Sequence, residues 1–326
     1  MGRRRILQWG VLALVAATPM ARPGRAQPWP DRVVRLIVPF TAGGATDVTA
    51  RLFASELAAA FRQSVIVDNR PGAAGAIGID QAAKAVNDGH TLAVGGVGPL
   101  ALLPTIDARL PYDPARDLEV VAGLSTVDFI LVARPGFAAG DARELIDYAK
   151  AHPGKVTFSS AGVAGPQQLM IEHLALLAGV TLFHVPFAGD TPAVAAVAAG
   201  DVDIALAGAA SALGLVKAGK LKAVAAGSGR LPGLPDLASV AEQTGFAEFM
   251  GYTWNILVAP KGVPAAIAAR LNEAVNEIAR RPAMIEKLEG LGLRPMPGSA
   301  REVADLVASD AAKYRRIVEL TGLRRE

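Results

Sequence analysis

Cysteine is absent from the 326-residue chain, which excludes disulfide frameworks, thiolate nucleophiles and cysteine-based metal sites. Aromatic residues make up only 5% of the chain and charged residues 19%, whereas 52% of the residues are hydrophobic. That balance is too apolar for a disordered chain and too polar for a protein with many membrane spans. The length also exceeds the roughly 250–300 residues at which a single core stops growing. We therefore expect a globular protein with two lobes.

Recognisable catalytic and metal-binding motifs are also scarce. The four histidines stand apart from one another, and none belongs to an H-E-x-x-H pair. The chain has no G-x-S-x-G nucleophile elbow, and no Walker lysine follows the glycines at 43–44. The run GGVG at 95–98 is only a partial match to a dinucleotide-binding fingerprint. We expect no catalytic residues, no metal site and no cofactor.

The amino terminus has the pattern of an export signal. Three arginines at 3–5 precede an apolar stretch at 6–17 and a run of small residues that reaches Ala26. The apolar stretch is shorter than the ~20 residues that a spanning helix needs, and the arginines loosely match a twin-arginine signal. We expect cleavage near Ala26, with Ala21 as the alternative, and an exported, soluble protein.

The apparent basicity of the chain comes largely from this signal. Five of the 33 basic residues and none of the 30 acidic residues lie in 1–26, so the remainder carries 28 basic against 30 acidic residues, a net charge of −2. We therefore expect no nucleic-acid-binding surface.

Apolar, β-branched strands alternate with amphipathic helices along the rest of the chain. This rhythm is typical of an α/β fold in which strands pair in parallel through right-handed crossovers. The helices that we expect near the carboxyl terminus cover 264–280 and 300–321. The main expected strands cover 33–40, 64–69, 90–96, 129–135 and 253–260.

Two of these strands bracket the middle third of the chain. Both the strand at 129–135 and the strand at 253–260 end in proline, and the alternation of strands and helices restarts between them. The simplest domain organisation is one lobe built from 27–128 and 253–326, and a second lobe, 129–252, inserted between them. The two bracketing strands would then cross between the lobes as a hinge.

A strand–loop–helix pattern occurs twice. The runs VPFTAGGATD at 38–47 and VPFAGDTPAV at 185–194 each place Pro-Phe at the end of a strand and small residues before a helix. In open α/β sheets ligands bind at the carboxyl ends of the strands, and helix amino termini present free N–H groups. Neither loop contains lysine or arginine. Two such loops facing each other predict a clamp that holds an anion mainly through backbone donors.

Individual residues in these regions have a structural interpretation beside the functional one. Asp47 could face the ligand or simply cap its helix. The serines and glycines at 159–165 suit an anion-binding nest or a plain capped turn. We favour Phe40 and Phe187 as flanks of the ligand site, and Trp254 could serve hinge packing or ligand contact.

The chain from position 29 onward resembles the extracytoplasmic solute receptors of tripartite tricarboxylate transporters, the Bug receptors of Bordetella-type bacteria. The runs that carry the resemblance include, in order, WPDRVVRLIVPFTAGGATDVTARLFA, VIVDNRPGAAGAIG, LPYDPARDLEVVAGL, KVTFSSAG, HVPFAGDTPAVAAVAAGDVD and WNILVAPKGVPAAIAARLN. The resemblance implies a periplasmic binding protein of the type II, Venus-flytrap fold. It also implies a small carboxylate as ligand and two membrane subunits that receive it. We expect the receptor itself to be a monomer.

The resemblance places ligand contacts in the first loop, around 160–166 and around 189–191. Together with the repeated loops and the glycine-rich end of the strand at 90–96, it gives a predicted contact set. That set is Phe40, Ala42, Gly43, Thr46, Asp47, Gly96, Gly98, Ser160, Gly162, Gly165, Gln167, Phe187, Gly189, Asp190, Thr191 and Ala207.

The chain departs from the family pattern near the same places. Ala164, Gly165 and Gln168 replace a glycine, a threonine and a histidine, and Ala207 replaces an acidic residue. Because that carboxylate is missing, we expect a ligand without an ammonium group. Two alternatives to a transport receptor stay open: a binding protein that presents its ligand to a sensor kinase, and an exported enzyme.

Overall fold

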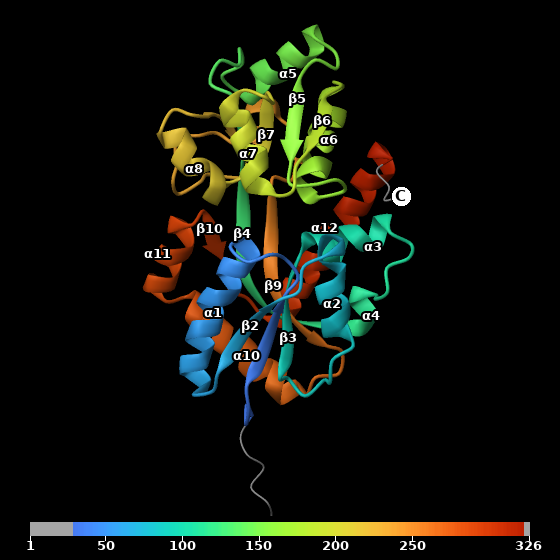
Figure 1. Ribbon diagram of the computed structural model, residues 1–326, viewed down its shortest axis with the longest axis vertical. Coiled ribbons are helices and arrows are strands. Elements are labelled where there is room, and N and C mark those ends of the chain that lie inside the picture. The colour runs from blue at the N-terminus through green and yellow to red at the C-terminus, as the bar shows by residue number, and fades with distance from the viewer. Residues whose placement is uncertain (1–28, 323–326) are drawn as a thin grey trace, which may run out of the picture.

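The computed structural model describes residues 29–322 as two lobes stacked along one long axis (Figure 1). The predicted export signal at 1–26 lies outside the described residues. Strand β4 (Leu118–Ala133) runs from the lower lobe into the upper one, and β9 (Tyr252–Pro260) runs antiparallel to it, back into the lower lobe. The lower lobe is called the first and the upper lobe the second. No helix in residues 29–322 is long and apolar enough to cross a membrane.

The sheet of the first lobe has the order β2-β1-β3-β9-β4, with β10 on the far edge of β4. Strand β1 pairs in parallel with β2 and β3, whereas β9 pairs antiparallel with both β3 and β4. The parallel pairing predicted from the alternation of strands and helices is confirmed for β1, β2 and β3, and the connecting strands add antiparallel pairing to it. The bounds are β1 Val34–Val38, β2 Val65–Asn69, β3 Thr91–Gly96, β4 Leu118–Ala133, β9 Tyr252–Pro260 and β10 Leu293–Pro295.

The sheet of the second lobe begins on the same strand, β4. Residues 118–128 of β4 pair with β9, and residues 129–133 pair with β7 on one side and β8 on the other. Beyond β7 the order continues through β5 to β6 with parallel pairing. The bounds are β5 Thr157–Ser160, β6 Phe183–Pro186, β7 Ile204–Gly208 and β8 Lys222–Ala226.

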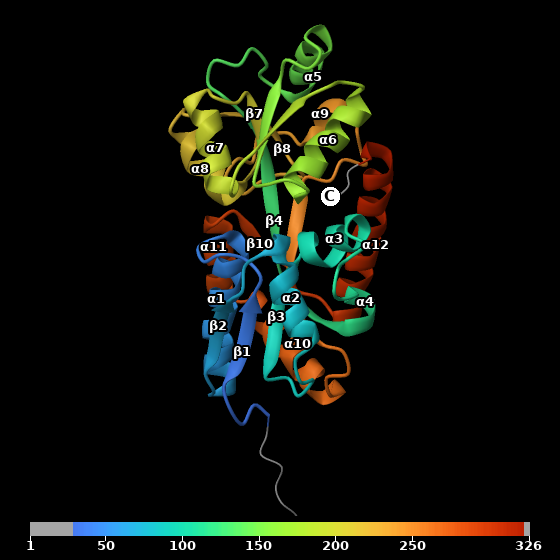
Figure 2. The ribbon, with the colours of Figure 1, turned by 45° about the vertical axis from the view of Figure 1, so that its right-hand side comes forward.

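Helices cover both sheets (Figures 1 and 2). In the first lobe they are α1 Ala45–Phe61, η1 Ala73–Gly75, α2 Ala76–Ala83, η2 Gly98–Leu102, α3 Leu103–Ile106, α4 Pro114–Asp117, α10 Ala265–Ala279, α11 Pro282–Gly290 and α12 Ala300–Thr321. In the second lobe they are α5 Ala142–Ala151, α6 Pro166–Ala178, α7 Asp190–Ala199, α8 Ala209–Lys217 and α9 Val240–Thr244. The predicted helices at 264–280 and 300–321 are confirmed as α10 and α12.

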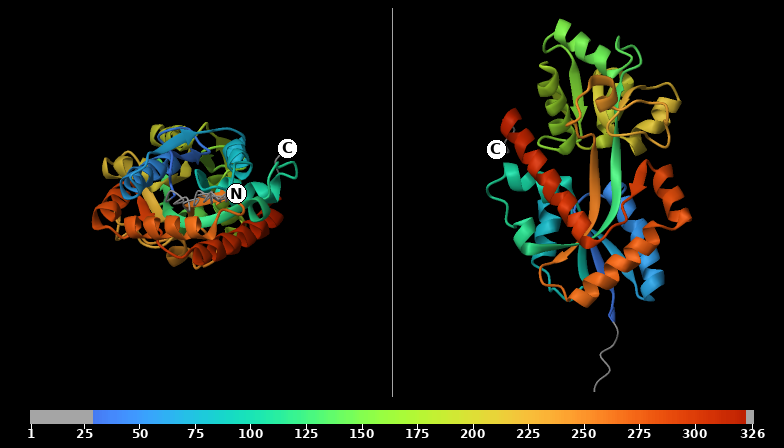
Figure 3. Two further views of the ribbon diagram at one scale, coloured as in Figure 1. Left: turned by 90° about the horizontal axis from the view of Figure 1, so that it is seen from below. Right: turned by 180° about the vertical axis from the view of Figure 1, so that it is seen from behind.

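The hydrophobic core is continuous between the lobes. One apolar cluster lies between the first sheet, α1 and α10, and another lies between the second sheet, α7 and α8. A third contains Ala93 and Tyr112 of the first lobe, Phe158 and Leu169 of the second, and Tyr314 of α12. Helix α12 lies behind the connecting strands (Figure 3) and contacts β4 and α6. The two lobes therefore share part of one core.

Two glycines pass close to β4 at Phe129, where its pairing changes from one sheet to the other. Gly227 directly follows β8, and Gly251 directly precedes β9. Phe129 donates its N–H to the Gly251 carbonyl (3.2 Å) and accepts from the Gly227 N–H (2.8 Å). A Cβ atom on Gly227 would overlap the Gly251 carbonyl oxygen and would lie 2.9 Å from the Phe129 oxygen. Only residues without a side chain permit this approach.

Candidate ligand-binding site

The carboxyl ends of the parallel strands in both lobes point to the junction between the lobes. The arrowhead of β5 points down toward the first lobe (Figure 1), and that of β1 points up toward the second (Figure 2). The loops that follow these strands, together with the first turns of the next helices, carry most of the predicted contact residues. This arrangement is the one in which open α/β sheets bind ligands.

The first of these loops leads from β1 into α1. Gly43 adopts a left-handed conformation (φ 89°), and Gly44 precedes the helix with extended backbone and no side-chain cap. The first N–H of the helical ladder is that of Val48, which donates to the Gly44 carbonyl (2.9 Å). The N–H groups of 45–47 thus precede the ladder, and they stand at the positive end of the helix dipole.

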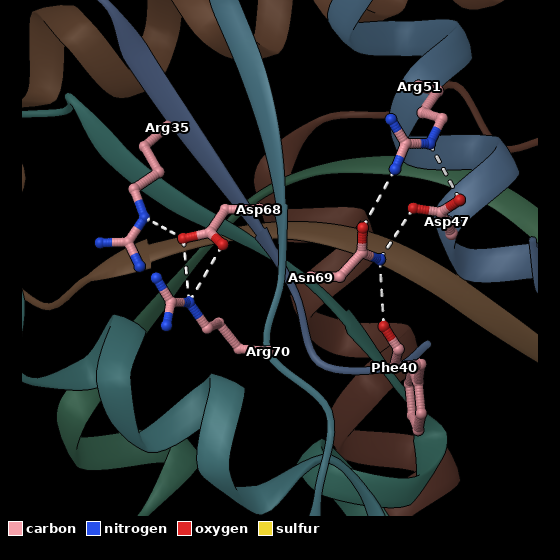
Figure 4. A network of polar contacts seen from close by, with 7 residues as sticks. All are labelled: Arg35, Phe40, Asp47, Arg51, Asp68, Asn69 and Arg70. Carbon is pink, nitrogen blue, oxygen red and sulfur yellow. Dashed lines mark hydrogen bonds and ion pairs between the residues drawn. The ribbon is translucent and has the colours of Figure 1, made fainter. Parts of the chain in front are cut away.

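The Asp47 side chain turns back onto its own loop. It is 2% exposed and accepts from the Gly43 N–H (2.9 Å), Arg51 Nε (2.9 Å) and Asn69 Nδ2 (2.8 Å) (Figure 4). Burial by itself would raise the pKa of Asp47, but these hydrogen bonds outweigh it and hold the pKa below its ordinary value. Of the two interpretations of Asp47, these contacts favour the structural one, in which its carboxylate supports the loop and uses the Gly43 N–H.

Asn69, which was not among the predicted residues, holds the loop in place. Its Nδ2 donates to the Phe40 carbonyl (3.0 Å) as well as to Asp47, and its Oδ1 accepts from Arg51 (3.0 Å) (Figure 4). Neighbouring Arg70 pairs with Asp68 (3.0 Å) and takes no part in the loop. The sequence signal was present, since Asn69 ends a strand parallel to β1, but its partner could not be named without the sheet register.

Thr46 connects the loop to both connecting strands. Its hydroxyl donates to Asn255 Oδ1 on β9 (2.8 Å), and Asn255 Nδ2 donates to Ser125 Oγ on β4 (3.2 Å). Ser125 in turn lies 3.1 Å from the hydroxyl of Thr49 on α1. Asn255, Ser125 and Thr49 are buried. A buried polar chain of this kind fixes the position of α1 relative to the connecting strands.

Two further loops of the first lobe lie beside Phe40. A Cβ atom on Gly75 would lie 3.3 Å from the Phe40 ring and 3.2 Å from the Pro99 side chain. Gly98 begins η2, and Gly96 is buried at the end of β3, where a Cβ atom would lie 3.4 Å from the Trp254 carbonyl oxygen. The structure thus brings together Phe40, the turn at Gly75 and the start of η2.

Trp254 has a structural role. It is 1% exposed, and its Nε1 donates to Asp310 Oδ2 of α12 (3.2 Å). Asp310 also accepts from the hydroxyl of Tyr252 (2.9 Å). Of the two interpretations of Trp254, hinge packing is the one that these contacts favour.

In the second lobe, the turn after β5 is closed by its own side chains. Ser160 is 2% exposed, its hydroxyl donates to the Gly162 carbonyl (2.9 Å), and it lies 2.7 Å from His184 Nε2. The Gly162 N–H donates to Ser160 Oγ (3.3 Å), and the Ala164 N–H to Gln168 Oε1 (2.7 Å). These contacts favour the capped-turn interpretation over the anion nest. Gly165 precedes α6, whose first residue is a proline.

The second repeated loop leads from β6 into α7. Gly189 has a left-handed φ of 129°, and Asp190 and Thr191 are the first residues of the helix. The Asp190 carboxylate accepts from Gln167 Nε2 (3.1 Å), from the Ser211 hydroxyl and from the Gly208 N–H. Burial raises the pKa of Asp190, because these hydrogen bonds offset the loss of hydration only in part.

The side chain of Ala207, one of the predicted contact residues, lies in the core of the second lobe. The residue is 0% exposed and belongs to the apolar cluster between the second sheet, α7 and α8. Because side chains alternate across a strand, position 207 faces the core. Phe187 is half-buried and packs against the same cluster.

No group of three or more histidine, aspartate or glutamate side chains within residues 29–322 is placed to hold a metal ion. The polar groups described in these loops are main-chain N–H groups, hydroxyls, amides, the carboxylates of Asp47 and Asp190, the Arg51 guanidinium and the His184 ring. Such a set suits recognition by hydrogen bonding.

Comparison with known proteins places the chain in one family. Residues 49–323 match the profile of the "Tripartite tricarboxylate transporter family receptor". Curated relatives include a UPF0065 protein from the tcbD-tcbE intergenic region of Pseudomonas sp. strain P51, 34% identical over 98% of this chain and 94% of the relative. Another is Protein BugT of Bordetella pertussis, 32% identical over 94% of this chain and 95% of the relative.

Solved structures agree with the sequence comparison. R. palustris Rpa4515, described with adipate, has a TM-score of 0.83 and 29% identity over 91% of this chain and 99% of its own. MatC (Rpa3494) from Rhodopseudomonas palustris, described with bound malate, has a TM-score of 0.78 and 31% identity over 89% of this chain and 100% of its own. Fold and sequence point the same way, and the chain belongs to the receptor family of tripartite tricarboxylate transporters.

Proposed function

We propose that this protein is a periplasmic receptor that captures a small organic carboxylate between its two lobes and delivers it to a tripartite transporter. The observation that carries the proposal is the amino end of α1, where the N–H groups of 45–47 precede the helical ladder at the junction between the lobes. A carboxylate is the natural acceptor for such a group of donors. Two structural relatives are described with dicarboxylates, adipate and malate.

The roles within the proposed site follow from the geometry described above. Backbone donors at Ala42 and 45–47 would bind the carboxylate, while Asp47 and Asn69 hold the loop that presents them. Phe40 and Phe187 would flank the ligand. Thr46 would transmit the position of the loop to the connecting strands through Asn255.

The lobes that would close on the ligand comprise 27–128 with 253–326, and 129–252. The change of pairing partners within β4 between 128 and 129 supports this division, and so does the close approach of backbone there. Closure would be a hinge motion about β4 and β9.

The remaining parts of the proposal concern the setting in which the receptor works. We expect a monomer in the periplasm, exported by its amino-terminal signal, with two membrane subunits as partners. The family name and the description of a structural relative as the periplasmic binding protein BugD support this setting.

Isothermal titration calorimetry against a panel of mono-, di- and tricarboxylates tests the proposed ligand class. We expect at least one compound to bind more tightly than millimolar. A panel without any binder of that strength would contradict a carboxylate receptor.

A proline variant tests the role of α1 directly. Ala45→Pro removes one N–H at the first helical position, where proline is tolerated, and the extended backbone of Gly44 (φ −78°, ψ 168°) suits a residue before proline. Because a charge-assisted hydrogen bond is lost, affinity should fall about tenfold with little change in stability. Ala300→Pro, the same change at the first position of α12, should leave affinity unchanged. Equal affinity in both variants would show that α1 does not bind the ligand.

An enzymatic role has one feature in its favour, the 2.7 Å contact between Ser160 Oγ and His184 Nε2. The Ser160 hydroxyl, however, is 2% exposed and already donates to the Gly162 carbonyl. Long incubation followed by recovery of the bound compound separates the two functions: a receptor returns it chemically intact, and an enzyme does not.

A further inference from the structure

Asp190 places a carboxylate at the amino ends of three helices of the second lobe. It is the first residue of α7, and its donors are Gln167 in the first turn of α6, Ser211 in the first turn of α8, and the N–H of Gly208 just before α8. The amino ends of three helices thus meet around one carboxylate of the protein itself. The positive ends of these helix dipoles therefore stabilise the negative charge of Asp190 itself.

The absence of a side chain at position 208 makes this arrangement possible. A Cβ atom on Gly208 would lie 3.2 Å from Asp190 Oδ2 and 3.6 Å from Ser211 Oγ. A larger residue would therefore crowd the carboxylate away from α8. The second lobe lacks a carboxylate at 207, but it has one from 190 instead, and the reason for expecting a ligand without an ammonium group is removed.

Within residues 29–322, no lysine or arginine forms an ion pair with Asp190. The segments 158–167, 185–193 and 205–213, which form the strand ends and helix starts around it, contain no lysine or arginine. The pKa of His184 is lowered by burial, so this histidine is neutral near pH 7. In the first lobe, by contrast, Asp47 is paired with Arg51. Of these two carboxylates, the one without a cationic partner is therefore Asp190 in the second lobe.

A carboxylate has about four acceptor positions, and three donors of the protein use Asp190. Asp190 is partly exposed, and a ligand donor would reach the fourth acceptor position from that exposed side. A second anionic group placed there would meet an unpaired like charge at short range, which is unfavourable in a partly desolvated site.

We propose that Asp190 determines specificity: the receptor selects a monocarboxylate whose distal end donates hydrogen bonds, as an amide or ammonium group does, and discriminates against dicarboxylates. The ligand carboxylate would lie at the start of α1 and the distal donor at Asp190. This inference rests on the proposed function and defines the ligand class of the same site.

Calorimetry with matched compounds tests the proposal. The probes are succinate, glutarate and adipate, each compared with its half-amide and with the ω-amino acid of equal chain length. In the wild type the preferred half-amide or amino acid should bind at least about tenfold more tightly than the matching dicarboxylate. In Asp190→Asn, the affinity for that half-amide or amino acid relative to the matching dicarboxylate should fall by about tenfold or more.

A control variant removes the same charge from the other end of α7. Asp201→Asn lies just beyond the carboxyl end of that helix and should leave the ratio unchanged. The role of Asp190 would be overturned if the wild type prefers a dicarboxylate, or if the affinity ratio is the same in Asp190→Asn and the wild type. Either result would still be compatible with a carboxylate receptor. Failure of every probe to bind would instead contradict the receptor and this inference together. If Asp190→Asn does not fold, the same affinity ratio is measured in Asp190→Ser and compared with the ratio in the wild type.

Discussion

Asp47 and Asp190 each lie in the first turn of the helix that follows a repeated loop, yet their carboxylates have different surroundings. Asp47 is buried and receives hydrogen bonds from a cation, an amide and a main-chain N–H. Asp190 receives only neutral donors and stays half-buried. The first side chain therefore supports a loop, and the second is the one that we propose to contact a ligand.

Replacing Asp47 should reduce stability. In Asp47→Ala the Gly43 N–H and the Asn69 amide lose a charged acceptor in a buried place, so the free energy of unfolding should fall by about 2–3 kcal/mol. Chemical denaturation measures the change. Arg51→Ala is the matched control, because its side chain is 52% exposed and exposed pairs contribute less than about 1 kcal/mol. If the two variants lose the same small amount, Asp47 does not anchor the loop.

The sequence predicted where the functional loops lie but not how their side chains point. Repetition of Val-Pro-Phe followed by small residues located both loops at strand ends. The direction of Asp47 depends on Asn69 in the neighbouring strand, and that of Asp190 on Gly208 and Ser211 beyond another strand. Such partners become neighbours only through the order and register of the sheets, which single-sequence patterns do not specify.

Strand β4 shows a comparable limit for whole elements. Its last part was expected at 129–135, but the preceding part, 118–128, was not identified as a strand. Register shifts between Val120 and Ala122 and between Gly123 and Ser125 interrupt the alternation of side chains there. Helix α11 was also missed, because it begins with Pro282 almost directly after α10 ends. Both features weaken the periodic signal from which elements are predicted.

The close approach of backbone at the hinge should not tolerate a side chain. Gly227→Ala places a methyl group against the carbonyl oxygens of Gly251 and Phe129, so the backbone must move apart where β4 passes between the lobes. We expect the free energy of unfolding to fall by about 1–3 kcal/mol, measured by chemical denaturation.

Gly214→Ala in α8 is the corresponding control. A Cβ atom there meets nothing within 4 Å, and alanine is a better helix former, so stability should stay the same or rise by up to about 1 kcal/mol. Equal stability of Gly227→Ala and the wild type would mean that the hinge has more room than described.

At the level of the complete protein, the shared core should couple the two lobes during unfolding. Multidomain proteins often unfold in separate steps, but one apolar cluster here includes Tyr112, Phe158, Leu169 and Tyr314 from both lobes and α12. We expect a single calorimetric transition with equal calorimetric and van't Hoff enthalpies. Two resolved transitions, each assigned to one lobe by limited proteolysis, would contradict this coupling.

Helix α12 covers one side of the connecting strands, so the two faces of the molecule differ. It packs against β4 and α6, and parting the lobes on that side would expose Tyr314, Ile317 and Val318 to water. In a receptor that works as proposed, the lobes would stay in contact along α12 and separate on the opposite face. A solute would then enter and leave through the face on which α1 and α7 are seen in Figure 1, and the membrane subunits proposed as partners would collect it at that same face.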